Sequence, residues 1–193
     1  MCKQQDILNE YRLFLEDLAS TNSSKLFTNG GKEYASILMS VLLDKTNSIA
    51  RIFSYGFRPD LVWTDPYREA LNRFVGSSYK ELRILVESVE AIDKEPISFL
   101  NDMFKKGNER VSVRLITEEE RNIIIDQLGG GHCNFAVYDD NKFRMEYEPE
   151  KFKAFGSFND VTTCEKLIRL FDSAFDKSTP LLPVEEYKKE HGS

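Results

Sequence analysis

Residues 132–159 read HCNFAVYDDNKFRMEYEPEKFKAFGSFN, and this stretch decides the expected fold. Two runs with strand character, residues 132–138 and 142–148, flank a turn-forming triplet at residues 139–141, which predicts a β-hairpin. A third short strand is expected over residues 152–156. Asn159 or Asp160 then caps a final helix whose apolar side chains fall on one face.

The residues before this stretch alternate between helical and strand patterns. Helices are expected over residues 6–19, 34–42, 65–76, 95–106 and 117–128, and strands over residues 48–55, 82–86 and 111–116. Such alternation is typical of α/β proteins with parallel strands. We therefore expect an α/β fold whose mixed, mostly parallel sheet is flanked by helices and followed by the hairpin and the final helix.

No linker divides the chain, so a single domain is expected. We assign residues 1–24 to an N-terminal helix, residues 25–178 to the domain and residues 179–193 to a polar C-terminal tail.

Composition and charge restrict the class of protein. The sequence has 41% hydrophobic and 30% charged residues, as ordinary globular proteins do, and its net charge of −6 disfavours non-specific binding to nucleic acid. We expect no membrane span and no signal peptide, since no apolar run is long enough. Three cysteines form no disulfide framework, so we expect reduced thiols and a cytoplasmic location. No residues have metal-ligand spacing, and we expect no metal and no cofactor.

Parts of residues 132–159 match a known signature, H-x-K, four residues, D, and later G-S/G-x-N. The matching residues are, in order, His132, Asp139, Gly156, Ser157 and Asn159. The chain therefore resembles the phospholipase D superfamily, over residues 25–178 in its pattern and over residues 132–159 in its motif. Two features depart from the family pattern: Asn134 stands at the lysine position, and the interval of 16 residues between Asp139 and Gly156 is long.

The resemblance implies a mechanism for phosphodiester cleavage. His132 would attack phosphorus, Asp139 would orient its imidazole, and Asn159 would hold phosphate oxygens, while a second histidine protonates the leaving group. This chain has one motif copy and its other histidine, His191, lies in the tail. A two-histidine site would therefore require a homodimer in which two His132 side chains meet at a two-fold axis.

The missing lysine weakens this mechanism. A lost charge-stabilising donor costs on the order of 2.7–4 kcal/mol of transition-state stabilisation. Arg144 is the candidate replacement, and with Asn134 and Ser157 it completes the expected phosphate-binding residues. Glu146 would support them, or it could equally neutralise Arg144 and make a structural polar network.

The register of the hairpin decides whether Arg144 reaches the site. A two-residue turn at 140–141 would pair Arg144 with Val137 and point it away from His132. A three-residue loop at 140–142 would pair Arg144 with Tyr138 and place it on the face of His132. We prefer the second register because it gathers the polar side chains of both strands on one face.

Three interpretations of the sequence remain open. The first is a catalytically dead phospholipase D-like module that binds a protein partner or assembles a complex in bacterial nucleic-acid processing or defence. The second is a metal-independent homodimeric phosphodiesterase or nuclease that cleaves DNA, RNA or a small phosphodiester through His132. The third is an unrelated α/β fold with a chance match. Asn134, the single motif copy and the acidic charge favour the first.

Overall fold

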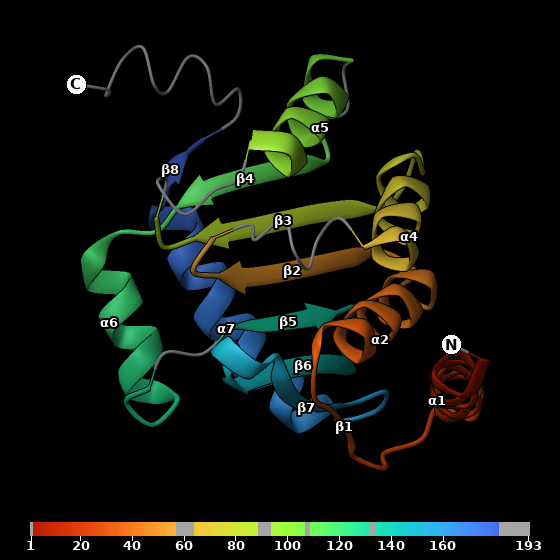
Figure 1. Ribbon diagram of the computed structural model, residues 1–193. Coiled ribbons are helices and arrows are strands. Elements are labelled where there is room, and N and C mark those ends of the chain that lie inside the picture. Colours follow the sequence, from red (N-terminus) through yellow and green to blue (C-terminus); the bar gives the residue numbers. More distant parts are fainter. Residues whose placement is uncertain (1, 57–63, 89–93, 107–108, 132–133, 182–193) are drawn as a thin grey trace.

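The computed structural model describes residues 2–56, 64–88, 94–106, 109–131 and 134–181. In these ranges eight strands form one sheet in the order β1-β7-β6-β5-β2-β3-β4-β8 (Figure 1). Their bounds are Phe27–Asn29 (β1), Ile49–Ser54 (β2), Glu81–Val86 (β3), Val111–Leu115 (β4), Phe135–Tyr138 (β5), Lys142–Glu148 (β6), Lys153–Ser157 (β7) and Thr179–Pro180 (β8). The expected mixed α/β sheet is confirmed.

Parallel pairing joins β2 to β3 and β3 to β4, whereas the other neighbouring strands pair antiparallel. The parallel part is therefore smaller than expected. The free edge of β2 pairs with β5, the first strand of the hairpin, and not with a further parallel strand. Strands β7 and β1 then extend the antiparallel half of the sheet beyond β6.

Helices cover both faces of the sheet (Figure 1). Their bounds are Cys2–Ser20 (α1), Lys32–Asp44 (α2), Asp65–Val75 (α4), Lys94–Lys105 (α5), Glu118–Gln127 (α6) and Val161–Lys177 (α7), with a short 3-10 helix at Pro149–Lys151 (η1). The core that contains α2 and α4 also contains buried residues of α1 and α5, while α6 and α7 contribute to a second core on the other face.

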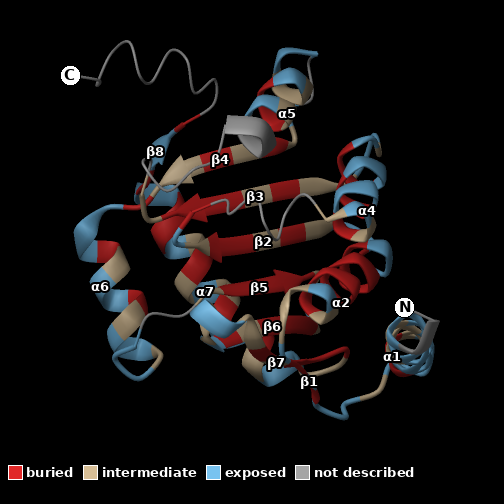
Figure 2. Cartoon of the chain, in the orientation of Figure 1, coloured by how far each residue is buried: buried red, intermediate tan, exposed pale blue. Residues whose placement is uncertain are grey.

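Alternation along the strands divides the apolar side chains between these two cores. Ile52 and Ile84 pack in the core of α2 and α4, whereas Phe53 and Leu85 pack in the core of α7. Figure 2 shows the central strands as mostly buried on both faces. Each large apolar side chain buried in this way stabilises the fold by about 1.5–3 kcal/mol.

Capping residues fix where two of the helices begin. The Thr117 hydroxyl accepts a hydrogen bond from the Glu120 backbone N–H at 3.3 Å and caps the start of α6. The Asp160 carboxylate accepts one from the Thr163 backbone N–H at 3.0 Å and opens α7. Of the two predicted caps for α7, Asp160 therefore takes the role rather than Asn159.

The sheet continues past residue 178, where the tail was expected to begin. Thr179 and Pro180 form the edge strand β8 against β4, and Leu181 is buried in the core of α2 and α4. Residues 182–193, with His191, lie outside the described residues.

The hairpin register differs from the preferred one by two residues. Tyr138 pairs with Lys142, which leaves a loop at residues 139–141, and Arg144 pairs with Ala136. Tyr138 as the predicted partner of Arg144 is therefore wrong. The predicted face of Arg144 is confirmed, because a shift of two residues keeps every side chain on its face.

Asp139 holds the hairpin loop against the start of β2. Its backbone has a left-handed φ of 55°. Its carboxylate accepts hydrogen bonds from the backbone N–H groups of Asn47 at 2.9 Å and Ser48 at 2.8 Å, and from Lys142 Nζ at 2.9 Å. Burial opposes ionisation, but these hydrogen bonds outweigh it and lower the pKa of Asp139 from 3.8 to about 2.

This lowered pKa predicts that Asp139 contributes to stability in a pH-dependent way. Because the folded-state pKa lies below the unfolded value, the contribution is complete above the unfolded pKa and is lost as the pH falls through about 2. We expect Asp139→Asn to reduce the free energy of unfolding by about 2 kcal/mol at neutral pH, and by less in acid. Urea unfolding across this pH range measures the difference.

Asp140→Asn is the matched control, since Asp140 is the exposed neighbour in the same loop. Equal losses in the two variants, or a loss at Asp139 that does not depend on pH, would contradict the role of the ionised carboxylate.

Candidate functional site

Asn134, Arg144 and Glu146 meet on one face of the hairpin and form a polar cluster. Asn134 Nδ2 donates a hydrogen bond to Glu146 Oε2 at 2.7 Å, and Arg144 Nη2 donates one to Glu146 Oε1 at 2.7 Å. Arg144 and Glu146 are 5% and 4% exposed. The structure thus brings together three of the residues that the sequence proposed for the site.

Further hydrogen bonds connect the polar cluster to other strands. Asn134 Oδ1 accepts a hydrogen bond from the Tyr55 backbone N–H at 2.9 Å, just beyond the end of β2. Arg144 Nε donates to Asn29 Oδ1 at 3.3 Å, and Asn29 Nδ2 donates to the carbonyl oxygen of Phe152. Both ends of the Asn134 amide are therefore already bonded within the protein.

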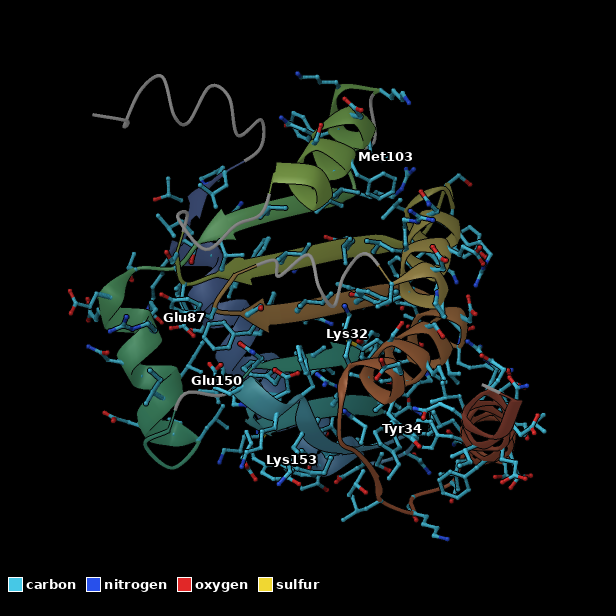
Figure 3. All side chains as sticks on the ribbon, viewed as in Figure 1. Lys32, Tyr34, Glu87, Met103, Glu150 and Lys153 are labelled. Atoms are coloured by element: carbon cyan, nitrogen blue, oxygen red, sulfur yellow. The ribbon has the colours of Figure 1, made fainter. Side chains whose placement is uncertain are left out.

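The polar cluster lies at the edge where the parallel strands end. Figure 1 shows β2, β3 and β4 pointing toward the side of the sheet on which α6 lies. Figure 3 shows Glu87, after β3, and Glu150, in η1, along the same edge. Ligands of open α/β sheets bind outside the carboxyl ends of the strands, so this is the edge at which a site is expected.

A cavity of about 60 Å³ adjoins the polar cluster. Its walls come from β2, β5, β6, α2 and α4, and the aromatic and polar residues among them include Phe53, Tyr67, Asn134, Tyr138, Arg144, Glu146 and Phe152. Burial raises the pKa of Tyr138 and of Tyr67, with a smaller opposing effect from the charge of Arg144. Both phenols therefore stay protonated at neutral pH.

Ser157 and Asn159 lie outside the polar cluster. Gly156 pairs with Arg144 and Ser157 with Phe143, so Ser157 lies on the opposite face of the sheet from Arg144. The backbone N–H of Asn159 donates to Ser157 Oγ at 3.1 Å. The next residue, Asp160, donates its backbone N–H to the carbonyl oxygen of Asn141 at 2.8 Å, which places this segment at the hairpin loop.

Asp139 is also remote from the polar cluster. It lies five residues after Asn134 at the other end of β5, which corresponds to about 16 Å in an extended strand. The long interval between Asp139 and Gly156 explains this division of the motif. It contains β6, η1 and the start of β7, so the chain reverses once more before residues 156–159 are reached.

His132, the expected nucleophile, and Cys133 lie outside the described residues. In the described part of the chain, no group of three or more His, Cys, Asp or Glu residues could hold a metal ion. In the same part, no helix has the length and apolar character needed to cross a membrane.

Sequence reasoning missed Asn29, Tyr67 and Tyr138 as residues of the site. The Asn29 side chain forms hydrogen bonds with residues more than 100 positions away in the sequence. Local patterns carry no signal for such contacts. Tyr138 could have been found, because it follows Asn134 at an even spacing and so shares its face.

The fold and the polar cluster define an α/β protein with a candidate site at the carboxyl edge of its parallel strands. The fold is that of the phospholipase D family. No family model and no curated protein matches the sequence. The expectation of an unrelated α/β fold is wrong, because the solved structure of a phospholipase D family member resembles this chain in fold over 81% of its length.

Three solved structures illustrate the likeness. Nuc from Salmonella typhimurium, a phospholipase D family member, has a TM-score of 0.53 and 12% identity, over 81% of this chain and 98% of Nuc. NucT from Helicobacter pylori has a TM-score of 0.52 and 13% identity, over 81% of this chain and 98% of NucT. TrmBL2, an archaeal chromatin protein that binds DNA, has a TM-score of 0.51 and 11% identity, over 92% of this chain and 64% of TrmBL2.

Proposed function

We propose that this chain is a binding or assembly module that has the phospholipase D fold and does not cleave phosphodiesters. One observation carries the proposal. Arg144, the candidate replacement for the missing lysine, already forms a buried ion pair with Glu146 and a hydrogen bond with Asn29. The charge of Glu146 already neutralises Arg144, so a phosphate at the remaining Nη1 would face the buried carboxylate and lose its hydration without a free counter-charge, which is strongly unfavourable.

The divided motif supports the same proposal. Phosphoryl transfer needs its nucleophile, its orienting carboxylate and its phosphate-binding groups within hydrogen-bond reach of one another. Asp139 instead binds backbone N–H groups at the start of β2, and Ser157 accepts the backbone N–H of Asn159 on the other face. These residues serve the architecture of the hairpin and of β7.

A similar fold occurs in TrmBL2, a chromatin protein that binds DNA, so the likeness is not limited to enzymes. For this chain the net charge of −6 favours a protein or a small molecule over nucleic acid. We therefore propose a role in assembly or ligand binding within a bacterial nucleic-acid-processing or defence system, in the cytoplasm and as a homodimer.

Hydrolysis assays test this proposal against the alternative, a metal-independent homodimeric phosphodiesterase with a His132 nucleophile. Bis(p-nitrophenyl) phosphate and labelled single- and double-stranded DNA are incubated in EDTA with wild type and with His132→Ala at equal purity. We expect the same background rate for both proteins. Cleavage by the wild type that disappears in His132→Ala would sink the proposal and establish the enzyme.

A further inference from the structure

The cavity beside the polar cluster contains hydrogen-bond donors that the described residues leave unsatisfied. The Tyr138 hydroxyl is fully buried and has no partner in the described part of the chain. Tyr67 also lines the cavity, and its hydroxyl makes no hydrogen bond to a described residue. Arg144 uses Nε and Nη2 for Asn29 and Glu146, so its Nη1 is left for another acceptor among the groups that the structure describes.

Buried donors in this state need an acceptor, because an unsatisfied polar group destabilises the folded protein. Glu146 is not that acceptor for the two phenols, because the described hydrogen bonds of its oxygens come from Arg144 and Asn134 and none comes from Tyr67 or Tyr138. The missing partner therefore has to come from outside the described chain, with its own oxygen or nitrogen lone pair.

The charges around the cavity select a neutral partner. Arg144 and Glu146 cancel one another, and Tyr67 and Tyr138 remain protonated because burial raises their pKa values. An anion would face the buried carboxylate of Glu146, and a cation would face the guanidinium of Arg144. Either charge would also lose its hydration without a free counter-charge.

Size and the remaining walls restrict the partner further. Met39, Ile52 and Phe152 add apolar surface to the cavity. Its volume of about 60 Å³ is well below the roughly 150 Å³ of an apolar cavity that holds benzene. The cavity therefore suits a group of a few heavy atoms with one polar and one apolar side.

We propose that this cavity binds a small neutral molecule, or the neutral end of a larger one, whose carbonyl or hydroxyl oxygen accepts hydrogen bonds from Tyr138, Tyr67 and Arg144. This inference rests on the proposed function, since it names the class of ligand that the binding module takes. A carbonyl group and an alcohol share the required chemistry, namely an uncharged acceptor oxygen on a small apolar body.

Three probes of nearly the same shape test the charge requirement. Acetamide is neutral, acetate is an anion and acetamidinium is a cation. Each is titrated into the full chain, and binding is followed by protein-observed NMR. We expect saturable shifts with acetamide, and affinities for acetate and acetamidinium that are weaker by about tenfold or more, because each loses hydration without a counter-charge.

Tyr138→Phe tests the hydrogen bond itself. The variant removes one donor and no carbon atom, so we expect the dissociation constant of acetamide to rise about fivefold. Tyr147→Phe is the matched control, because Tyr147 is 52% exposed and lies outside the cavity, and it should leave the affinity unchanged. Thermal unfolding of both variants verifies that they fold.

Several outcomes would overturn the inference: no saturable binding of acetamide, tighter binding of acetate than of acetamide, or the same affinity in Tyr138→Phe as in wild type. The first would mean that the cavity holds water alone. None of these results requires phosphodiester cleavage. Cleavage that depends on His132 would overturn the proposed function whether or not acetamide binds. The failure of the proposed function and the failure of this inference are therefore distinguishable.

Discussion

Glu146→Gln is expected to lower the free energy of unfolding by about 3–5 kcal/mol, because it leaves Arg144 as a buried cation without a counter-charge. Glu146 is 4% exposed and its two oxygens bind Arg144 and Asn134. The glutamine has nearly the same shape but carries no charge and can accept through one oxygen atom. Urea unfolding at neutral pH measures the loss.

Glu148→Gln provides the matched control on the same strand. Glu148 pairs with Lys151 and Lys153 at the surface, where its side chain is 37% exposed and solvent screens the charges. We expect Glu148→Gln to change the stability little. Similar losses in the two variants would contradict the distinction between the buried pair and the surface pair.

A double replacement separates the ion pair from the packing around it. Replacing a buried pair by apolar side chains of similar volume is often neutral, whereas removal of one partner is costly. Arg144→Met combined with Glu146→Leu should therefore be more stable than either single variant. Losses that simply add would show that the two side chains do not depend on one another.

Gly156→Ala is expected to destabilise the protein by at least about 4 kcal/mol, which is exceptional for one methyl group. A Cβ at this position would lie 2.1 Å from the carbonyl oxygen of Phe143 and 2.7 Å from the ring of Phe27. The Phe143 oxygen belongs to the backbone of β6, which is paired on both sides, so it cannot move away cheaply.

Gly30→Ala is the control for this variant. Its Cβ would meet Lys153 Cγ at 3.9 Å, an ordinary van der Waals contact. Soluble yield and the urea midpoint compare the two proteins. If Gly156→Ala is as stable as Gly30→Ala, the close packing of β7 on β6 and β1 is not as described.

The result at Gly156 also bears on how the motif is interpreted. In the sequence, this glycine was matched with Ser157 and Asn159 to the last part of the phospholipase D signature. The structure gives it a packing role between β6 and β1. A glycine that matches the signature at this position can therefore be required by backbone packing as well as by phosphate chemistry.

Much of the fold could be predicted because its signals are local. Apolar periodicity located the described helices, and the described strands other than β1 and β8, to within a few residues. The shared face of Asn134, Arg144 and Glu146 followed from the alternation of polar residues along β5 and β6.

The register and the motif geometry could not be predicted in this way. Asp139 adopts a positive φ, which residues other than glycine rarely take. This conformation places the hairpin loop at residues 139–141, whereas the sequence suggested 140–141 or 140–142. The positions of Asn29 and Phe152 depend on the pairing of β1 with β7, which joins distant parts of the sequence. A single sequence contains no local pattern for such long-range pairing.

The most direct test concerns the availability of Arg144 to phosphate. Wild-type protein is titrated with inorganic phosphate while the Nε–H resonance of Arg144, assigned with Arg144→Lys, is followed by NMR. Because Arg144 is paired with Glu146 and bonded to Asn29, the account predicts that this resonance does not move. A saturable shift of the Arg144 resonance would show that phosphate binds at Arg144 in spite of Glu146, and it would contradict the proposal that this site does not bind phosphate.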